Sequence, residues 1–282
     1  MAMNEKQKML ISNKRHDDGI IFCWLGNAGW LLRAKEGLFA FDLDLSGAVE
    51  RLTPSPISAE DLAPYLDAVM YTHEHGDHFH RETASILAAK SNCTFVFPVS
   101  CRSVADDLGI PDSRKECARP GAAFSLLGAS ILPVKALHGH LRGSIYNEAN
   151  FDDCGYHVKL GGVSLFQPGD SVLLYEHAML PPTDILFVSP TEHNMQVEKS
   201  AVFIEWVKPR MTYAQHFGTY VQTPENTFWT RGCQEELSRA LNDPCGYCIP
   251  TIGEVYEYIV MPPQNAKGNG CTVPSMRAAT LI

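Results

Sequence analysis

No stretch of the sequence approaches the ~20 consecutive apolar residues that a membrane-spanning helix needs. Lys and Arg residues form no run and the formal net charge is −9, so we expect no nucleic-acid-binding surface, although a local basic pocket for a small anion is compatible with this charge. Residues 1–18 are polar, and the apolar segment of a signal peptide does not follow their four basic side chains. These absences predict a cytoplasmic protein with a small-molecule partner, bound to neither nucleic acid nor membrane; a homo-oligomer stays open.

Nine cysteines are dispersed through the chain. Because their number is odd and no export signal precedes them, reduced thiols are the simplest interpretation. Cys245 and Cys248 form a C-x-x-C pair, a pattern that can be redox-active or half of a zinc site. No second ligand pair lies nearby, and the preceding Asn-Asp-Pro is typical of a turn, so we interpret the pair as two free thiols in a loop.

The chain of 282 residues is long enough to bury a large core, and 45% hydrophobic with 20% charged residues is typical of a globular protein. We predict a polar N-terminal segment at 1–18, a single domain at 19–262 and a tail at 263–282. Short apolar runs alternate with periodic helical segments, which predicts the α/β class with helices laid over sheets. Strands are expected at 20–24, 30–34, 38–41, 68–71, 94–98, 125–127, 130–136, 155–160, 163–166, 184–188, 210–214 and 255–260. Helices are expected at 58–66, 82–90, 103–108, 196–206 and 225–241.

Four side chains that can bind a metal lie within six residues, in the pattern His73-x-His75-x-Asp77-His78. They follow residues 68–71, an apolar run with the composition of a buried strand. His73 and His75 can point the same way from an extended segment, while Asp77 and His78 follow on the turn. Their nitrogen and oxygen donors suit zinc, manganese or iron, whereas a hydrophobic core would not accept three imidazoles and a carboxylate. The motif therefore predicts a metal site at a strand end.

This motif resembles the signature of the metallo-β-lactamase-fold superfamily. Residues 24–30, with the sequence Trp-Leu-Gly-Asn-Ala-Gly-Trp, and the later Phe41-Asp42 are similar to the branch that includes L-ascorbate-6-phosphate lactonase and other predicted metal-dependent hydrolases. The matches extend from about residue 24 to about residue 219. The resemblance implies an αββα sandwich, in which two mixed sheets pack face to face with helices outside.

The same resemblance implies ligands at three later strand ends. His138 would complete a histidine triad, with His140 as the alternative ligand if the register slips and otherwise a group that supports a ligand or faces the substrate. Asp170, after Pro-Gly, would bridge two cations, because each carboxylate oxygen can bind one metal. The implied dinuclear site has His73, His75 and His138 on one ion, Asp77, His78 and His216 on the other, and Asp170 between them.

For two further residues, the sequence is compatible with both a structural role and a functional role. Asp42 is either a turn aspartate or a group that orients a ligating histidine from beneath the site. His193 lies in the loop 189–194, which should face the cleft, and it either contacts solvent or serves in substrate binding or proton transfer. We take Asp77, His140 and His193 as the candidate catalytic residues.

Two cations about 3.5–4 Å apart can hold a bridging water, lower its pKa from about 15.7 toward about 7, and polarise a carbonyl or phosphoryl oxygen. The sequence thus predicts a hydrolase that uses a metal-bridged hydroxide, with two zinc or manganese ions, or iron. The resemblance implies manganese and a lactone or other ester of a small anionic or sugar-like molecule. Alternatives are a phosphodiesterase on the same site and a non-catalytic metal-binding or sensor protein, which would lack a ligand. A di-iron site that reduces oxygen is disfavoured, because such relatives have glutamate where this chain has His75.

Overall fold

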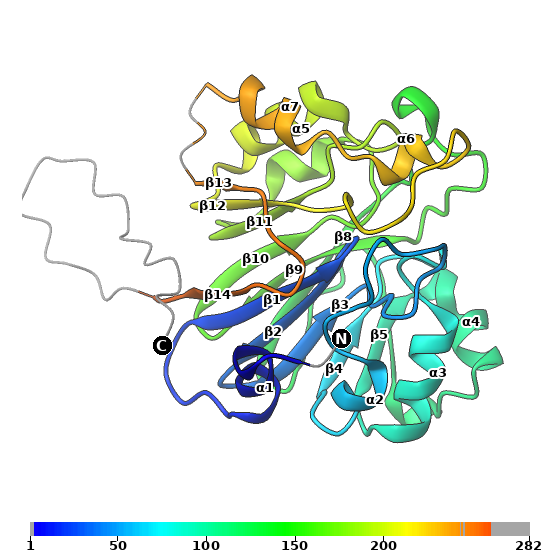
Figure 1. The fold of residues 1–282 in the computed structure, drawn as a ribbon, viewed down its shortest axis with the longest axis vertical. Coiled ribbons are helices and arrows are strands. Elements are labelled where there is room, and N and C mark those ends of the chain that lie inside the picture. The colour runs from blue at the N-terminus through cyan, green and yellow to red at the C-terminus, as the bar shows by residue number, and fades with distance from the viewer. Residues whose placement is uncertain (1–2, 243, 245, 261–282) are drawn as a thin grey trace, which may run out of the picture.

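The computed structural model describes residues 3–242, 244 and 246–260. Two seven-stranded sheets pack face to face, and helices cover their outer faces (Figure 1). The expected αββα sandwich is therefore confirmed.

The first sheet has the strand order β14-β1-β2-β3-β4-β5-β6. Strands β14 to β3 pair antiparallel, and β3 to β6 pair parallel. The bounds of its strands are β1 Ile20–Gly26, β2 Gly29–Ala34, β3 Gly37–Phe41, β4 Ala68–Met70, β5 Thr94–Pro98, β6 Lys115–Ala118 and β14 Val255–Tyr258.

The second sheet repeats this mixed pattern in the order β13-β12-β11-β10-β9-β8-β7, antiparallel from β7 to β10 and parallel from β10 to β13. Its strands are β7 Phe124–Leu126, β8 Ala129–Lys135, β9 Cys154–Leu160, β10 Val163–Gln167, β11 Ile185–Val188, β12 Met211–Ala214 and β13 Tyr247–Cys248. Because parallel strands need crossover connections, the parallel part of each sheet carries helices and long loops, and all the candidate ligands except His138 lie on these loops. His138 lies on the long loop between the antiparallel strands β8 and β9.

The helices form one layer on each outer face of the sandwich (Figure 1). Those of the first layer are α1 Glu5–Ser12, α2 Ala59–Leu62, α3 Arg81–Lys90 and α4 Arg102–Asp107. Those of the second layer are α5 Gln196–Val207, α6 Thr227–Thr230 and α7 Gln234–Ala240. Short 3-10 helices are η1 Val99–Cys101, η2 Asp112–Arg114, η3 Leu141–Gly143 and η4 Tyr175–Met179.

Buried hydrophobic side chains form three clusters, one between the sheets and one beneath each helical layer. In β1, Phe22 and Trp24 pack between the sheets, while Cys23 and Leu25 pack beneath the first helical layer. This alternation follows from the two-residue period of a strand, and it explains why strands buried on both faces are apolar throughout.

The structure differs from the sequence-based elements in several places. The polar N-terminal segment contains α1, whose Leu10 and Ile11 are buried and whose last carbonyls accept hydrogen bonds from Arg33. The short edge strands β6 and β13 were not expected. The prediction of a single helix over 225–241 is wrong, because Gly232 at φ +60° separates α6 from α7. The expected helix over 58–66 begins at its Ser58 cap but ends at Leu62.

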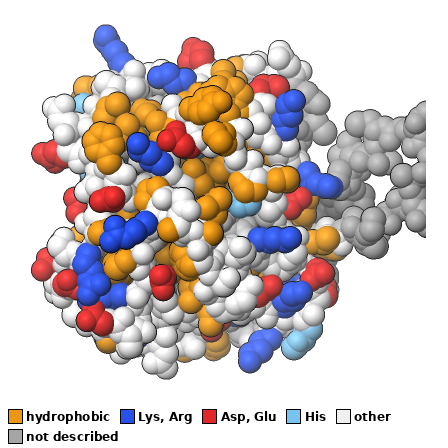
Figure 2. Space-filling model, turned by 180° about the vertical axis from the view of Figure 1, so that it is seen from behind, with side chains coloured by type: hydrophobic (Ala, Val, Ile, Leu, Met, Phe, Trp, Pro, Cys, Tyr) orange, Lys and Arg blue, Asp and Glu red, His pale blue; other side chains and the backbone are white. Residues whose placement is uncertain are grey.

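Cys248 is a free thiol in β13, whereas Cys245 and the tail at 263–282 lie outside the described residues. Among the described helices, none combines the length and apolarity that crossing a membrane requires. On the face shown in Figure 2, Lys and Arg side chains lie among Asp and Glu side chains, and the described residues form no continuous basic patch there.

Candidate functional site

The seven expected ligands come together at one edge of the sandwich, although they come from both sheets. One set follows β4 of the first sheet, and the other follows three strands of the second sheet, β8, β10 and β12. From β4 come His73, His75, Asp77 and His78, and from the second sheet come His138, Asp170 and His216. The ligand atoms form two adjacent groups.

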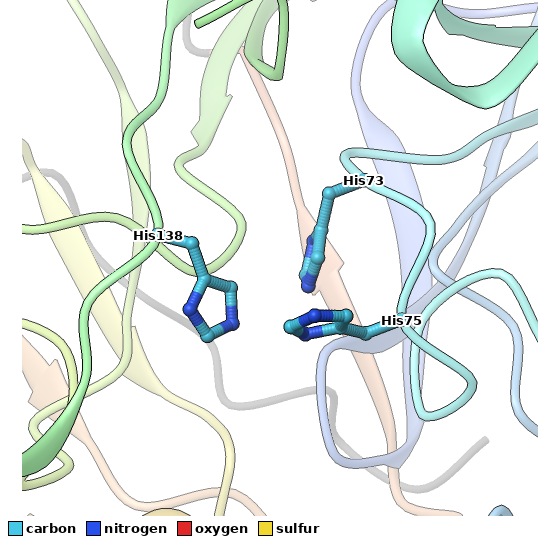
Figure 3. Close-up of side chains that lie close together, drawn as sticks. All are labelled: His73, His75 and His138. Carbon is cyan, nitrogen blue, oxygen red and sulfur yellow. The ribbon is translucent and has the colours of Figure 1, made fainter. Parts of the chain in front are cut away.

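The first group contains His73, His75 and His138, whose ring nitrogens lie within 4.8 Å of one another. Figure 3 shows the three imidazoles pointing toward a common centre, two from the loop after β4 and one from the loop after β8. His73 and His138 are buried, and His75 is partly exposed to the cavity described below. Three convergent imidazoles are a set that binds zinc and other transition metals.

The second group contains Asp77, His78, Asp170 and His216. Nε2 of His78 lies 3.3 Å from Nε2 of His216, and the carboxylate of Asp170 lies 3.4 Å from the first and 3.2 Å from the second. Oδ2 of Asp77 lies 3.6 Å from His78 and 3.5 Å from His216. Two carboxylates and two imidazoles therefore surround one small volume.

Hydrogen bonds behind the rings assign the tautomers of His73 and His78. The hydroxyl of Thr72 donates its one hydrogen to Oδ2 of Asp42, so it accepts from Nδ1–H of His73, 3.1 Å away. Asp42 also accepts from Nδ1–H of His78 at 2.9 Å and from the backbone N–H of Thr72 at 2.8 Å. Both histidines thus present an Nε2 lone pair to the site.

His138 and His216 are oriented in the same way by backbone carbonyls. Nδ1 of His138 donates to the carbonyl of Gly139 at 2.6 Å, and Nδ1 of His216 donates to the carbonyl of Trp229 at 2.9 Å. Metal-binding histidines commonly use their second nitrogen in this way, which fixes the ring and leaves the first nitrogen free to bind.

The assigned tautomers and the unpartnered polar atoms show whether a cation fits the site. With Nδ1 of each ring carrying a hydrogen, neutral His78 and neutral His216 face each other with their Nε2 lone pairs across 3.3 Å, an arrangement that a shared proton or a bound cation relieves. Nε2 of His73 and Oδ1 of Asp170 are buried and have no hydrogen-bond partner among the described residues. A divalent cation in each group would satisfy these atoms, and mixed nitrogen and oxygen donors suit zinc, manganese or iron.

The two groups differ in electrostatic character. Burial, followed by the neighbouring imidazoles of His78, His75 and His138, holds the pKa of His73 well below its usual value. For His216, burial opposes the charged form, but the carboxylates of Asp170 and Asp77 outweigh it and raise the pKa to about 9. The first group therefore favours neutral imidazoles, while the second carries the carboxylates that neutralise a bound positive charge.

Asp42 is the support beneath the site rather than an ordinary turn residue. Its carboxylate is fully buried, at 0% exposure, and its hydrogen bonds reach both His78 and the Thr72 that orients His73. Asn27 is a second support, which the sequence did not single out. Its Nδ2 donates to the backbone carbonyl of Asp77 at 3.0 Å and to Oδ2 of Asp77 at 3.1 Å. Its φ of 47° is a conformation that asparagine tolerates, and the Gly-Asn-Ala-Gly turn was the available signal.

His193 is buried and not a solvated loop residue. Its Nε2 lies 2.7 Å from Oδ2 of Asp170, so it donates to that carboxylate, which can only accept. Together with His138 and Asp170 it also forms a third set of atoms that could hold a cation. The loops approach so closely that a Cβ on Gly139 would lie 1.6 Å from the carbonyl oxygen of His193.

His140 belongs to none of the groups of ligand atoms formed by the described residues. Its ring lies 5.4 Å from that of Tyr146 and 5.6 Å from that of Phe228, at the side of the cavity. The structure thus places His138, and not His140, with His73 and His75.

A cavity of about 490 Å³ opens over the two groups. Its floor consists of the ligands His75, Asp77, His138 and Asp170 together with His193. Its walls consist of Ala48, Val49, His140, Tyr146, Phe228 and Trp229. No sequence pattern indicated the three aromatic wall residues, because they lie in segments without a motif.

Comparison with known proteins gives a family assignment. The model of a family described as "Beta-lactamase superfamily domain" matches residues 41–217, more than half of the chain. A UPF0173 metal-dependent hydrolase of Carboxydothermus hydrogenoformans is 28% identical over 204 residues, which cover 70% of this chain and 84% of that protein. A relative of the same description from Thermococcus kodakarensis is 26% identical and covers 83% of this chain and 97% of its own length.

Among solved structures, Igni18, a metallo hydrolase from Ignicoccus hospitalis, is similar with a TM-score of 0.65 and 16% identity. The alignment covers 86% of this chain and 100% of Igni18, so the whole sandwich is shared. The matched residues of the family model begin at the end of β3, next to Asp42, and extend past His216, and the chain belongs to this beta-lactamase superfamily domain family.

Proposed function

We propose that this protein is a metal-dependent hydrolase with a dinuclear centre, acting on a lactone or other ester. The observation that carries the proposal is the convergence of seven ligand side chains from both sheets, with the Nε2 atoms of four histidines turned inward by hydrogen bonds that their Nδ1–H groups donate. The names of the relatives, which are metal-dependent hydrolases, support the reaction class.

Cations bound at the two groups would supply Lewis acidity, which lowers the pKa of water and polarises a carbonyl oxygen. The residues of the chain do the remaining work. Asp170 lies between the groups, 3.4 Å from His78 and 3.5 Å from His138, so its two oxygens can serve both. His193 donates to that carboxylate and holds it in place. His140 and Tyr146 are the wall residues with exchangeable protons, and one of them protonates the leaving oxygen.

The first experiment measures metal content per chain by elemental analysis, together with turnover of 4-nitrophenyl hexanoate, γ-caprolactone and bis(4-nitrophenyl) phosphate. We expect two equivalents of zinc, manganese or iron and hydrolysis of the ester or the lactone. His75→Ala and Asp170→Asn should each lower kcat/KM by roughly 10²-fold or more, with loss of metal. A matched control is His16→Ala, which changes an exposed histidine outside the site.

Full activity in both site variants, or no metal after reconstitution, would refute the dinuclear mechanism. Turnover of the phosphodiester alone would assign the site to phosphodiester hydrolysis. Two bound metals without any turnover would favour the metal-binding or sensor protein.

A further inference from the structure

The walls of the cavity bear no Lys or Arg side chain among the described residues that line it. The two negatively charged side chains in the cavity, Asp77 and Asp170, belong to the floor. A substrate held against the floor would therefore meet walls without a Lys or Arg side chain, and His140 is the one wall side chain that can carry a positive charge toward a second anionic group.

Three arginines follow wall residues by two positions: Arg142 is exposed and does not line the cavity, and the other two are engaged elsewhere. Arg51 follows Val49 by two positions, and its guanidinium donates to the carbonyls of Leu25, Asp44 and Thr53. Arg231 follows Trp229 by two positions and pairs with Glu236 at 3.0 Å. Neither guanidinium lines the cavity.

The walls are instead aromatic. The ring of Tyr146 lies 5.7 Å from that of His75, 5.3 Å from that of His138 and 5.4 Å from that of His140. Phe228, on α6, has its ring 6.0 Å from that of His193. An aromatic surface thus begins directly at the ligand histidines and continues outward.

These aromatic residues are tied to the ligands through the backbone. The N–H of Tyr146 donates to the carbonyl of His138 at 3.0 Å. The carbonyl of Trp229 accepts from His216, as described above. Because the ligands and the walls share these bonds, the apolar surface has a defined position relative to the ligand histidines.

We propose that the substrate carries an uncharged, apolar acyl group that packs against Tyr146, Phe228 and Trp229, and that substrates with a second anionic group are rejected. This inference rests on the proposed hydrolase function and differs from the anionic or sugar-like substrate that the lactonase resemblance implies. Burying a carboxylate against apolar walls without a partner is unfavourable, whereas an alkyl or aryl group gains from leaving water.

The test compares two esters with one leaving group and equal acyl length, 4-nitrophenyl hexanoate and 4-nitrophenyl monoadipate, on the metal-loaded enzyme. We expect kcat/KM to favour the hexanoate by about tenfold or more, a difference that corresponds to about 1.4 kcal/mol. Equal values, or a preference for the adipate, would overturn the inference.

A charge placed on the wall should change this preference. Val49 is a wall residue with 37% exposure, so Val49→Lys can be accommodated and puts an ammonium group at the cavity. We expect the preference for hexanoate to fall several-fold in this variant. The matched control is Val202→Lys, at 40% exposure on α5 outside the cavity, which should keep the full preference. An unchanged preference in Val49→Lys would contradict the inference.

A binding measurement with anilides in place of the esters tests this inference independently of the hydrolase proposal. Trp229 lines the cavity, so its fluorescence should report titration with hexananilide and with adipic acid monoanilide, and Trp229→Phe identifies the signal. We expect hexananilide to bind about tenfold more tightly or better. Such a preference without turnover of any ester would support the apolar pocket and refute the hydrolase. Turnover of both esters without a preference in binding or kcat/KM would support the hydrolase and refute the apolar pocket.

Discussion

The metal ligands at the floor of the cavity are mostly buried and are held by hydrogen bonds to Asp42, after β3, and to the backbone of α6, whereas the aromatic wall residues lie on the loop after β8 and on α6 and are partly open to solvent. In the floor, each ligand histidine that has an Nδ1 partner is fixed in one tautomer. In the walls, Tyr146 and Phe228 are positioned mainly by their backbone and by ring contacts. We expect metal binding and the choice of substrate to depend on largely separate residues, although the wall residues His140 and Tyr146 are also the proposed proton donors.

The largest effect, a loss of stability, is expected where a backbone position next to the floor leaves no space for a Cβ atom. Gly169 precedes Asp170 at φ +62°, and a Cβ there would lie 2.6 Å from Cβ of Thr72. Gly218 has nearly the same φ, +61°, but nothing lies within 4 Å of its Cβ position. Gly169→Ala should lower the free energy of unfolding by about 1–3 kcal/mol more than Gly218→Ala, because both share the strain of φ but only one has the clash. Urea denaturation and metal analysis measure this, and equal losses would contradict the prediction.

Two buried aspartates on the segment after β3 allow the floor and the walls to be tested separately, because one contacts a metal ligand and the other contacts the wall loop. Asp42 orients His78, whereas Asp44 accepts hydrogen bonds from the N–H groups of Gly47 and Ala48 and from the hydroxyl of Tyr220. Asp42→Asn should weaken metal affinity by about 10–100-fold, because an amide NH₂ facing Nδ1 of His78 favours the tautomer that blocks Nε2.

Asp44→Asn should leave metal affinity unchanged and raise KM, because it loosens the wall loop. Competition with a chelator measures the affinities of the two variants, and ester hydrolysis gives KM. Equal metal loss in both variants would show that floor and walls are not separable.

Truncation of one wall residue should lower kcat/KM for the substrate and leave the metal content unchanged. Tyr146→Ala removes a ring that lies beside His75 and His138, and we expect kcat/KM for 4-nitrophenyl hexanoate to fall about tenfold with metal content unchanged. Tyr175→Ala is the control, because Tyr175 is 75% exposed and does not line the cavity. Loss of metal in Tyr146→Ala would mean that the wall also holds the floor in place.

The smallest effect concerns acid sensitivity that originates outside the cavity. His177 packs against Phe166 and Phe203, and burial lowers its pKa from the usual 6.5 to about 4. Because the unfolded chain binds the proton more readily, stability from this residue is complete above pH 6.5 and is lost as the pH falls toward 4.

Between pH 7 and pH 5.5 this loss is about 1 kcal/mol. His177→Phe should show a correspondingly smaller loss over that interval, measured by urea denaturation of both proteins at several pH values. The same loss in wild type and variant would assign all the acid sensitivity to other groups.

The floor could be predicted from the sequence because its ligands lie in a dense local motif or directly after apolar strands. The support by Asp42 could be proposed but not decided, since it depends on Thr72 and His78 meeting one carboxylate in three dimensions. Asn27 was missed for the same reason, because its partner Asp77 is 50 residues away.

The aromatic part of the walls could not be predicted, whereas the wall residue His140 was already a candidate. Tyr146 lies in a loop without periodicity, and Phe228 and Trp229 lie in a segment expected to be one long helix. The N-terminal helix α1 was also missed, because its own residues are mostly polar and it is held by Arg33 of β2, a contact distant in sequence.

The division of the ligands between the two sheets has a further consequence for the lifetime of the fold. Any cation held by His73, His75 and His138, or by His78 and His216, crosslinks the two sheets in addition to their apolar packing and the hydrogen bonds between them. By mass action, such a ligand adds about 2.7 kcal/mol at a free concentration one hundred times its dissociation constant. Metal supply would then set not only the fraction of active molecules but also how long each molecule resists proteolysis.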